Sequence, residues 1–442
     1  MPRVLIVSPR FPPVNAADLH RVRVSLPHFS DFGWEPLVLS VDPGYVEEKS
    51  EALLLETIPP DTLTWRVRAL PARWTRKLGL GDLSLRALPF LYAAGLKIIR
   101  QREVDLVYFS TTAFISMALG RLWKKRTGVP FVLDIQDLWL SDYYNDKPRH
   151  QRPPKYWFSQ RLHRALEPWT MKSVDGLVAV SADYIETLEM RYPWLKERPR
   201  VTLPFGASEV DFEILKANPQ TNRFFTRGDG LIHGVYVGRG GRDMEPALSI
   251  IFGAFRQGLD ETPAQFSKVR LHFIGTDYAP PDRARNTITP VASRLGLQDY
   301  VDEFPGRVPY FESLQLLLDA DFLIVPGSDD PQYTASKIYP YILARKPMLA
   351  VFHERSSVRD VLLRTRAGTV LTFATGESAS LLTQQCLNLW SELLQQLPFS
   401  PQTDWTAFAP YTAGEMTRRQ CSLFDQVIET KKPYSRDVVS VQ

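Results

Sequence analysis

Short apolar runs rich in β-branched residues recur along the chain, and each is followed by a loop and a helical spacing of apolar positions. In the first half the predicted strands are residues 4–8, 36–41, 105–110, 131–135, 176–181 and 201–205. In the second half they are residues 234–238, 271–275, 301–304, 322–326, 348–352 and 369–373. These runs lack strict two-residue alternation, which indicates strands buried on both faces of a parallel sheet. Alternating strands and helices predict doubly wound α/β domains.

The series of strands breaks once, between residues 206 and 233, where the sequence is polar and irregular. We therefore predict an N-terminal Rossmann-like domain over residues 1–206, an interdomain connection over 207–232 and a C-terminal Rossmann-like domain over 233–400. A helical tail over residues 401–442 is expected to pack back on the N-terminal domain. Ligands bind outside the carboxyl ends of parallel strands, so the loops after the strands are the candidate sites.

Composition narrows the class of protein. Hydrophobic residues make up 44% of the 442 residues and charged residues 23%, as in an ordinary globular protein. The net charge of +4 is far below that of a nucleic-acid coat protein, and no binding motif accompanies it, so no nucleic-acid partner is expected. Two cysteines exclude a disulfide framework and favour a reducing compartment. Neither a signal peptide nor a transmembrane run is recognised, so we expect a cytoplasmic protein.

A Gly-Arg segment follows the first predicted strand of the second half. Gly238, Gly240 and Gly241 would let the backbone approach a phosphate, and Arg239 and Arg242 can neutralise one. The spacing differs from the GxGxxG of dinucleotide enzymes. Taken alone, these residues fit an ordinary glycine-rich turn with two solvated arginines equally well.

Residues 327–337 connect another predicted strand to a helix. Thr334 or Ser336 is a suitable N-cap for that helix. The free N–H groups of the helix start, with Lys337 as an added charge, suit a diphosphate. The alternative is a capped surface helix without a ligand.

Two segments of the first half also follow predicted strands. Residues 8–18 leave the first strand and are followed by Arg21 and Arg23, although they also fit a proline-stiffened connection. Asp134 and Asp137 come at the end of a buried strand, where a carboxylate can bind a hydroxyl or act as a base. The alternative for Asp137 is a cap on the next segment.

Basic and aromatic residues are interleaved over residues 65–102 and again over 147–164. Such a composition suits contact with an anionic membrane surface, as an enzyme with a lipid-linked acceptor would need. This pattern extends the expected location to the inner face of the membrane. A solvated helix face is the bland alternative.

Taken together, these segments resemble the GT-B glycosyltransferases of family GT4. The resemblance is carried by residues 7–13 (VSPRFPP), 132–139 (VLDIQDLW), 237–239 (VGR), 306–310 (GRVPY), 320–321 (AD) and 335–347 (ASKIYPYILARKP), in the family's order. It implies two Rossmann-like domains facing a cleft, with a nucleotide-sugar in the second and an acceptor in the first. It further implies transfer of the sugar to an acceptor hydroxyl with retention of configuration, and no metal or other cofactor.

The resemblance also implies roles for individual residues. Gly238 and Arg239 fall on the donor diphosphate, with Arg242 in place of a lysine that the family usually carries. Ser336 and Lys337 fall where helix-start groups hold the same diphosphate.

Two further pairs are assigned in the same way. Arg307 and Val308 fall near the nucleotide base. Asn15 and Ala16 stand where family members often carry glycines beside the diphosphate. We expect Asp137, together with Arg239 and Lys337, to take part in catalysis.

The sequence departs from the family at two positions. The family often has two glutamates eight positions apart near the helix, and here they are Gln332 and Pro340. The second glutamate usually contacts the ribose hydroxyls, which proline cannot do, and Asp329 or Asp330 is a possible substitute.

These observations predict a retaining glycosyltransferase of surface-glycan, polysaccharide or glycolipid synthesis, with a glycan or lipid-linked acceptor. The alternative is a catalytically degenerate GT-B protein that binds a nucleotide-sugar or a partner without transfer. A nucleotide-sugar 2-epimerase on the same fold is a third, weaker hypothesis.

Overall fold

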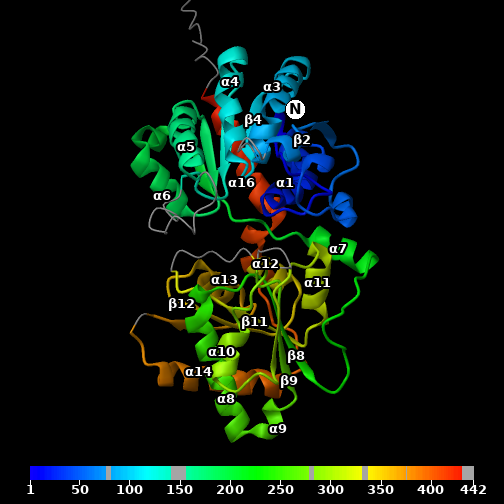
Figure 1. Ribbon diagram of the computed structural model, residues 1–442, viewed down its shortest axis with the longest axis vertical. Coiled ribbons are helices and arrows are strands. Elements are labelled where there is room, and N and C mark those ends of the chain that lie inside the picture. Colours follow the sequence, from blue (N-terminus) through cyan, green and yellow to red (C-terminus); the bar gives the residue numbers. More distant parts are fainter. Residues whose placement is uncertain (76–80, 141–155, 278–282, 331–336, 375, 431–442) are drawn as a thin grey trace, which may run out of the picture. The chain divides into compact units, whose positions relative to one another are not determined.

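The computed structural model describes residues 1–75, 81–140, 156–277, 283–330, 337–374 and 376–430. Its contacts divide the chain into two compact units (Figure 1). Unit 1 comprises Met1–Gly206 and Ala413–Gln442, and unit 2 comprises Ala207–Thr412. The helix cap predicted at Thr334 or Ser336 lies outside the described residues.

Unit 1 is built on a seven-stranded sheet in which every neighbouring pair of strands is parallel. The strand order is β3-β2-β1-β4-β5-β6-β7. The strands are β1 Arg3–Val7, β2 Glu35–Val41, β3 Leu63–Val67, β4 Leu106–Ser110, β5 Phe131–Ile135, β6 Gly176–Ala179 and β7 Arg200–Thr202. The three central strands β1, β4 and β5 are buried almost throughout, as the unbroken apolar runs predict.

The edge strand β3 is absent from the predicted set. Its sequence, Leu-Thr-Trp-Arg-Val, alternates, and every residue keeps some exposure. An edge strand is covered less completely than a central one, so its apolar signal is weak.

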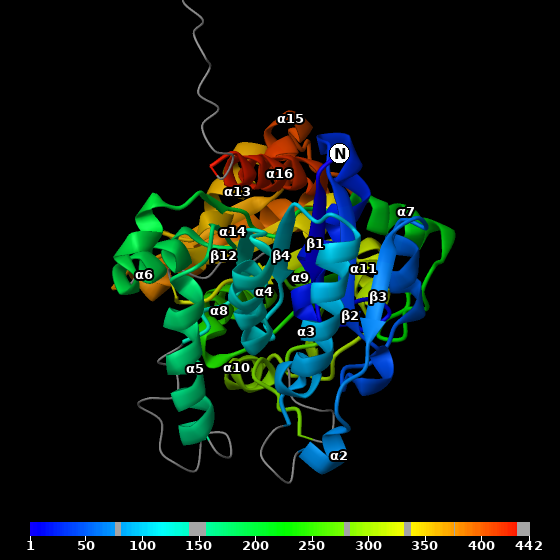
Figure 2. The same ribbon diagram turned by 90° about the horizontal axis from the view of Figure 1, so that it is seen from above.

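The helices of unit 1 lie on both faces of its sheet. They are α1 His20–Ser25, α2 Ala72–Thr75, α3 Leu83–Gln101, α4 Ala118–Thr127, α5 Tyr156–Met171, α6 Ala182–Arg191 and α16 Ala413–Glu429. Helix α4 contacts both α3 and α5, and the three helices cover one face of the sheet (Figure 2). Helix α16, from the C-terminal part of the chain, packs against α1, β6 and β7.

Aromatic packing holds α16 in unit 1. The ring of Phe424 lies 5.3 Å from Trp34 and 5.1 Å from Tyr108, centroid to centroid. The indole N–H of Trp34 donates to Asp425 at 3.1 Å. The helix therefore completes the core of a domain that begins more than 370 residues earlier in the sequence.

Unit 2 is built on a six-stranded parallel sheet in the order β10-β9-β8-β11-β12-β13. The strands are β8 Ile232–Val237, β9 Val269–Ile274, β10 Val301–Phe304, β11 Phe322–Pro326, β12 Met348–His353 and β13 Thr369–Phe373. The helices are α7 Glu209–Ala217, α8 Glu245–Glu261, α9 Pro263–Phe266, α10 Thr289–Arg294, α11 Tyr310–Asp319, α12 Ile338–Leu343, α13 Ser357–Thr365, α14 Ala379–Gln396 and α15 Trp405–Phe408. The prediction of two doubly wound parallel-sheet domains is confirmed.

The limits of the units differ from the predicted boundaries at two places. The stretch 207–232 belongs to unit 2, where Arg223 pairs with Glu312 at 2.9 Å and Phe225 stacks on His233 at 4.7 Å. Residues 401–412 also belong to unit 2, so only the part of the tail from Ala413 onward joins unit 1. Polarity made 207–232 look like a linker, whereas long-range contacts hold it on the sheet.

Each sheet has one topological switch point, where the strand order reverses. In unit 1 it lies between β1 and β4, and in unit 2 between β8 and β11. Loops leaving the carboxyl ends of two such strands diverge to opposite faces and leave a crevice, which is the usual ligand site of an open α/β sheet. The residues that follow these four strands are therefore the candidate ligand-binding residues.

Candidate functional site

In unit 2, two tyrosines fix the loop that follows β8. The phenol of Tyr236 donates to the carbonyl oxygen of Arg239 at 2.9 Å. The phenol of Tyr341, on α12, accepts from the backbone N–H of Val237 at 2.7 Å and donates to its carbonyl at 3.1 Å. The end of the strand is thus tied both to its own loop and to the helix after β11.

Three glycines of this loop each make room for a polar group. A Cβ at Gly238 would lie 2.6 Å from the Nζ of Lys337 and 2.8 Å from the hydroxyl of Tyr236. A Cβ at Gly240 would clash with the hydroxyl of Thr287, and one at Gly241 with the carboxylate of Asp243. The glycines therefore allow the close approach of these side chains.

Positive charge gathers at this switch point. Lys337 lies directly before α12, and its Nζ is 6.0 Å from the ring centre of Tyr236. Burial, with added repulsion from Arg239 and Arg307, lowers the pKa of Lys337 to about 7. Because two neighbouring cations disfavour the protonated form of Lys337, an anion bound beside it would stabilise that form.

The guanidinium of Arg239 is held by a carboxylate four residues later. Its two terminal nitrogens lie 3.0 Å and 2.6 Å from the two carboxylate oxygens of Asp243. Burial opposes the charge of Asp243, yet hydrogen bonds from Arg239 and Ser328 bring the pKa of that carboxyl below its ordinary value.

The loop after β11 meets the loop after β8 through the same residue. The backbone N–H of Asp329 donates to the carbonyl of Asp243 at 2.7 Å, and the neighbouring Ser328 is buried. The side chain of Asp329 is exposed. Ser336 and Gln332 lie outside the described residues, and Pro340 stands in the first turn of α12.

The other predicted donor residues are less constrained. Arg307 and Val308 follow β10; the side chain of Arg307 is exposed and that of Val308 is partly exposed. Arg242 is exposed in a short turn before α8. The structure thus brings Gly238, Arg239 and Lys337 together, with Arg307 close enough to lower the pKa of the lysine.

Sequence reasoning missed the carboxylates that organise this region. Glu303, on β10, accepts from the backbone N–H groups of Thr287, Ile288 and Thr289 at 2.8–2.9 Å and from the hydroxyls of Thr276 and Thr289. It holds the segment against which Gly240 packs. Asp243 carried one usable signal, its i,i+4 spacing from Arg239.

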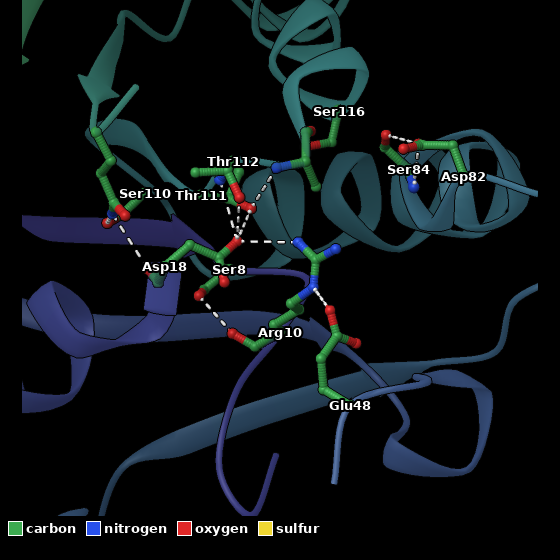
Figure 3. Close-up of polar contacts among 12 residues, drawn as sticks. Ser8, Arg10, Asp18, Glu48, Asp82, Ser84, Ser110, Thr111, Thr112 and Ser116 are labelled. Carbon is green, nitrogen blue, oxygen red and sulfur yellow. Dashed lines mark hydrogen bonds and ion pairs between the residues drawn. The ribbon is translucent and has the colours of Figure 1, made fainter. Parts of the chain in front are cut away.

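In unit 1, Asp18 joins the loops that follow β1 and β4. One of its carboxylate oxygens accepts from Arg10, from the hydroxyls of Thr111 and Thr112 and from the backbone N–H of Thr112, at 2.9–3.2 Å (Figure 3). Arg10 in turn donates from Nε to Glu48 at 2.6 Å. Burial works against the charge of Arg10, but the two carboxylates raise its pKa above the ordinary value.

A second polar cluster of unit 1 is buried. The guanidinium of Arg21, 2% exposed, lies 2.7 Å from the carboxylate of Asp134, which has no exposure. The same oxygen of Asp134 accepts from Ser110 at 2.7 Å and from Gln136 at 2.8 Å. Arg21 also donates to the carbonyl of Leu203 at 2.6 Å, so it ties the end of β5 to the segment after β7.

Three predicted residues of unit 1 remain as predictions. The amide of Asn15 donates to Glu51 at 2.9 Å, and Ala16 is buried beside it. Asp137 is exposed and accepts from the backbone N–H of Leu138 at 2.9 Å. Desolvation raises the pKa of Asp137, against the effect of that hydrogen bond.

The described residues contain neither a membrane-spanning helix nor a cluster of metal-ligating side chains. No helix in this part of the chain is long and apolar enough to cross a membrane. No group of three or more His, Cys, Asp or Glu side chains among these residues is arranged to hold a metal ion. Asp319 and Asp321 pair instead with Arg227 at 3.7 Å and with the backbone N–H of His233 at 2.8 Å.

The fold is shared with solved structures, one of which is described as a glycosyltransferase. A glycosyltransferase from Rickettsia africae has 13% identity and a TM-score of 0.55, covering 97% of this chain and 99% of its own. Anabaena Alr3699/HepE, solved with UDP-glucose, has 16% identity and a TM-score of 0.52, covering 97% and 98%. An E. coli structure described as trehalose-6-phosphate bound with UDP-2-fluoro glucose has 10% identity and a TM-score of 0.53, covering 96% and 99%.

Two parallel-sheet, Rossmann-like units and these neighbours define a protein of the GT-B fold. More particularly, residues 16–206 match the family model described as "Glycosyl transferase 4-like domain". The resemblance to the GT-B glycosyltransferases is thereby confirmed. No curated protein matches the sequence.

Proposed function

We propose that the protein is a retaining glycosyltransferase that takes a sugar from a nucleotide-sugar bound to unit 2. The observation that carries the proposal is the group of cations at the switch point of that unit. Lys337 lies against Gly238 and faces Arg239 and Arg307, so one more negative group would relieve its repulsion. The diphosphate of a nucleotide-sugar supplies such a negative group.

The chemistry follows from this placement. As the bond to the sugar breaks, negative charge grows on the diphosphate and the sugar becomes oxocarbenium-like. Lys337 and Arg239 stabilise that charge from fixed positions, and removal of one such group typically costs about 10²–10³ in rate. We propose that these side chains carry the charge without a metal ion.

The neighbouring structures support a choice of nucleotide to test first. The Anabaena and E. coli structures of this fold were solved with UDP-sugars, so UDP and UDP-glucose head the series, followed by GDP and ADP. Thermal unfolding of the wild type is measured with each ligand, because a ligand at about 100 times its Kd adds roughly 2.7 kcal/mol of stability. We expect a shift with one base.

The decisive comparison is between two lysines of unit 2. Lys337→Ala is expected to abolish the ligand-induced shift and to lower transfer, with the fold intact. Lys346→Ala is the matched control, because Lys346 lies among Arg227, Asp319 and Asp321 instead of the proposed diphosphate group. An unchanged shift and unchanged transfer in Lys337→Ala would overturn the site assignment.

A second candidate function is binding without transfer. It is favoured by Pro340, which occupies the first turn of α12 where the family usually carries a ribose-binding glutamate. In that case the wild type binds a nucleotide-sugar, but incubation with glycan and lipid-linked acceptors releases no nucleoside diphosphate. Release of free sugar without an acceptor would point to the epimerase alternative.

On the acceptor side, we propose that unit 1 lies on an anionic membrane surface. Helices α3, α4 and α5 contain one carboxylate in their sequences, Glu167, and it is buried. Guanidinium groups on or beside these helices stack on aromatic rings, as Arg126 does on Tyr92 at 5.4 Å and Arg68 on Phe90 at 4.8 Å. Arg86 is an exception, since it is buried and donates to three backbone carbonyls.

The membrane proposal is tested by flotation with vesicles. We expect binding to vesicles that contain phosphatidylglycerol and none to pure phosphatidylcholine, with release by salt. The exposed Lys97, Arg100 and Lys125 are replaced together by glutamine in the variant expected to lose binding. Equal binding by the variant would contradict the assignment of this face.

A further inference from the structure

Asp243 is the residue through which the two loops at the switch point of unit 2 meet. Its carboxylate holds both terminal nitrogens of Arg239, from the loop after β8, at 3.0 Å and 2.6 Å. Its carbonyl accepts from the backbone N–H of Asp329, in the loop after β11, at 2.7 Å. The buried Ser328 of that second loop also hydrogen-bonds to the Asp243 carboxylate. No role was assigned to Asp243 from the sequence pattern.

The backbone around the Arg239–Asp243 pair is shaped to admit it. A Cβ on Gly241 would collide with the carboxylate of Asp243 and lie 2.9 Å from a terminal nitrogen of Arg239. Glycine at this point leaves room for the ion pair in the geometry observed. The arginine is therefore held by a two-point fork against a fixed backbone, which restricts its direction far more than a solvated side chain.

Two further cations lie beside the pair. Arg239 and Arg307 both disfavour the protonated form of Lys337, and Asp243 is the carboxylate that holds Arg239. A guanidinium has five N–H donors, and a carboxylate fork uses two of them. The Arg239–Asp243 pair therefore places an oriented guanidinium beside Lys337, and one residue, Asp243, sets the spacing of the two loops.

We propose that Asp243 is a positioning residue for the diphosphate: it aims Arg239 and fixes the distance between the two loops that bind the donor. The inference rests on the proposed function, because it concerns the same site. The role of Asp243 is nevertheless a separate claim, because a donor site could use Arg239 and Lys337 without depending on Asp243. A carboxylate placed beside a bound dianion would by its charge alone weaken binding, so a net benefit must come from orientation.

The test is a double-mutant cycle on binding. Asp243→Asn, Arg239→Ala and the double variant are titrated with UDP and, independently of any base, with inorganic pyrophosphate in a calorimeter. Asp243→Asn preserves shape and removes the charge. We expect it to weaken binding about tenfold when Arg239 is present and less than about twofold when Arg239 is already alanine.

The control is another Arg–Asp pair of the same unit. Arg256 and Asp260 form an i,i+4 ion pair on α8 that is exposed to solvent. Asp260→Asn removes an equivalent charge from the same unit and is expected to leave binding unchanged. Arg239→Lys keeps the positive charge but cannot form the fork, and it is expected to behave like Asp243→Asn. This second variant keeps the test open if Asp243→Asn folds poorly.

The outcomes separate the two proposals. If the wild type binds neither UDP, GDP, ADP nor pyrophosphate, the proposed function fails and the inference fails with it. If the wild type binds but Asp243→Asn has no effect, or an equal effect in both Arg239 backgrounds, only the positioning role is overturned. Tighter binding by Asp243→Asn would show that its charge repels the ligand and would also overturn the role.

Discussion

The two switch points of this protein use cations differently. In unit 1, Arg10 is paired with Asp18 and Glu48, and Arg21 is paired with Asp134. In unit 2, Lys337 faces two further cations, Arg239 and Arg307. At this position the cations of unit 1 are paired with carboxylates, whereas Lys337 of unit 2 lies beside other cations, where we propose that an anionic ligand binds. Strand order locates both regions, and the balance of charge separates their roles.

The largest expected effect comes from removing a structural cation of unit 1. Arg21→Ala leaves the carboxylate of Asp134 buried without its partner, and such a loss typically costs about 3–5 kcal/mol. The free energy of unfolding is measured by urea denaturation followed by circular dichroism. Arg239→Ala, the corresponding change in unit 2, is expected to alter stability by less than about 1 kcal/mol because its pair is partly solvated. Equal losses of stability in Arg21→Ala and Arg239→Ala would contradict the proposed difference between the two regions.

A smaller effect is expected from filling the space beside Lys337. In Gly238→Ala the new methyl would displace the lysine ammonium, so nucleotide affinity should fall by about 2 kcal/mol, roughly thirtyfold. Isothermal calorimetry with UDP-glucose measures the change.

The matched change for Gly238 is Gly253→Ala in the middle of α8. There the new methyl would meet its nearest neighbour at 3.5 Å, so it fits, and helix propensity should raise stability by about 0.5–1 kcal/mol. A similar loss of binding in both variants would mean that the effect of Gly238→Ala is not specific to the space beside Lys337.

The pH dependence of donor binding follows from Lys337. Its pKa is lowered to about 7 in the free protein, and a bound diphosphate stabilises the protonated form. Affinity for UDP-glucose should therefore be greatest below pH 7 and fall by up to about tenfold, or 1.4 kcal/mol, per pH unit above it. Lys337→Arg, which stays charged, should remove the slope; a slope retained in that variant would contradict the assignment.

The stability of the free protein should respond to the same group in the opposite sense. Between the folded pKa of about 7 and the ordinary value of 10.5, the unfolded chain binds more protons than the folded one. The contribution of Lys337 to stability therefore rises with pH across this window. Thermal unfolding of the wild type and of Lys337→Met over that range provides the comparison.

A further effect on stability concerns the hydroxyls around Asp18. Thr111 is buried, donates to Asp18 at 2.9 Å and accepts from the N–H of Ala113 at 2.9 Å. Thr111→Val keeps the volume and removes both bonds, so the expected loss of stability is about 1–2 kcal/mol. Chemical denaturation measures the loss, and nucleotide binding to unit 2 should not change. A change in nucleotide affinity would contradict a purely structural role in unit 1.

Much of the fold was predictable because parallel strands carry a local signal. Fully buried strands such as β1, β4, β11 and β12 are continuous apolar runs, and each was found from the sequence within one or two residues. The edge strand β3 was missed because partial exposure removes that signal. The Gly-Arg loop became a candidate because it follows β8 directly, and Lys337 because it stands at the start of the helix after β11.

The partners of the recognised residues could not be predicted in the same way. Asp134 was a candidate for the site, but it is an internal anchor because Arg21, 113 positions earlier, reaches it. Glu303 accepts hydrogen bonds from residues 14 to 27 positions before it. No rule of sequence spacing predicts such a contact, so Glu303 was not linked to the Gly-Arg loop from the sequence. Arg86 seemed part of a basic surface, but its side chain is buried and donates hydrogen bonds to three backbone carbonyls.

The sequence by itself determined two doubly wound units, the order of their motifs and the two cations of the proposed donor site. Those features depend on residue type and on spacing along a single element. Only the tertiary structure decided which carboxylate neutralises which cation, that residues 207–232 belong to a folded unit, and that the chain divides at Ala413. Such pairings depend on distances between segments far apart in the chain, and these distances exist only once both sheets have formed.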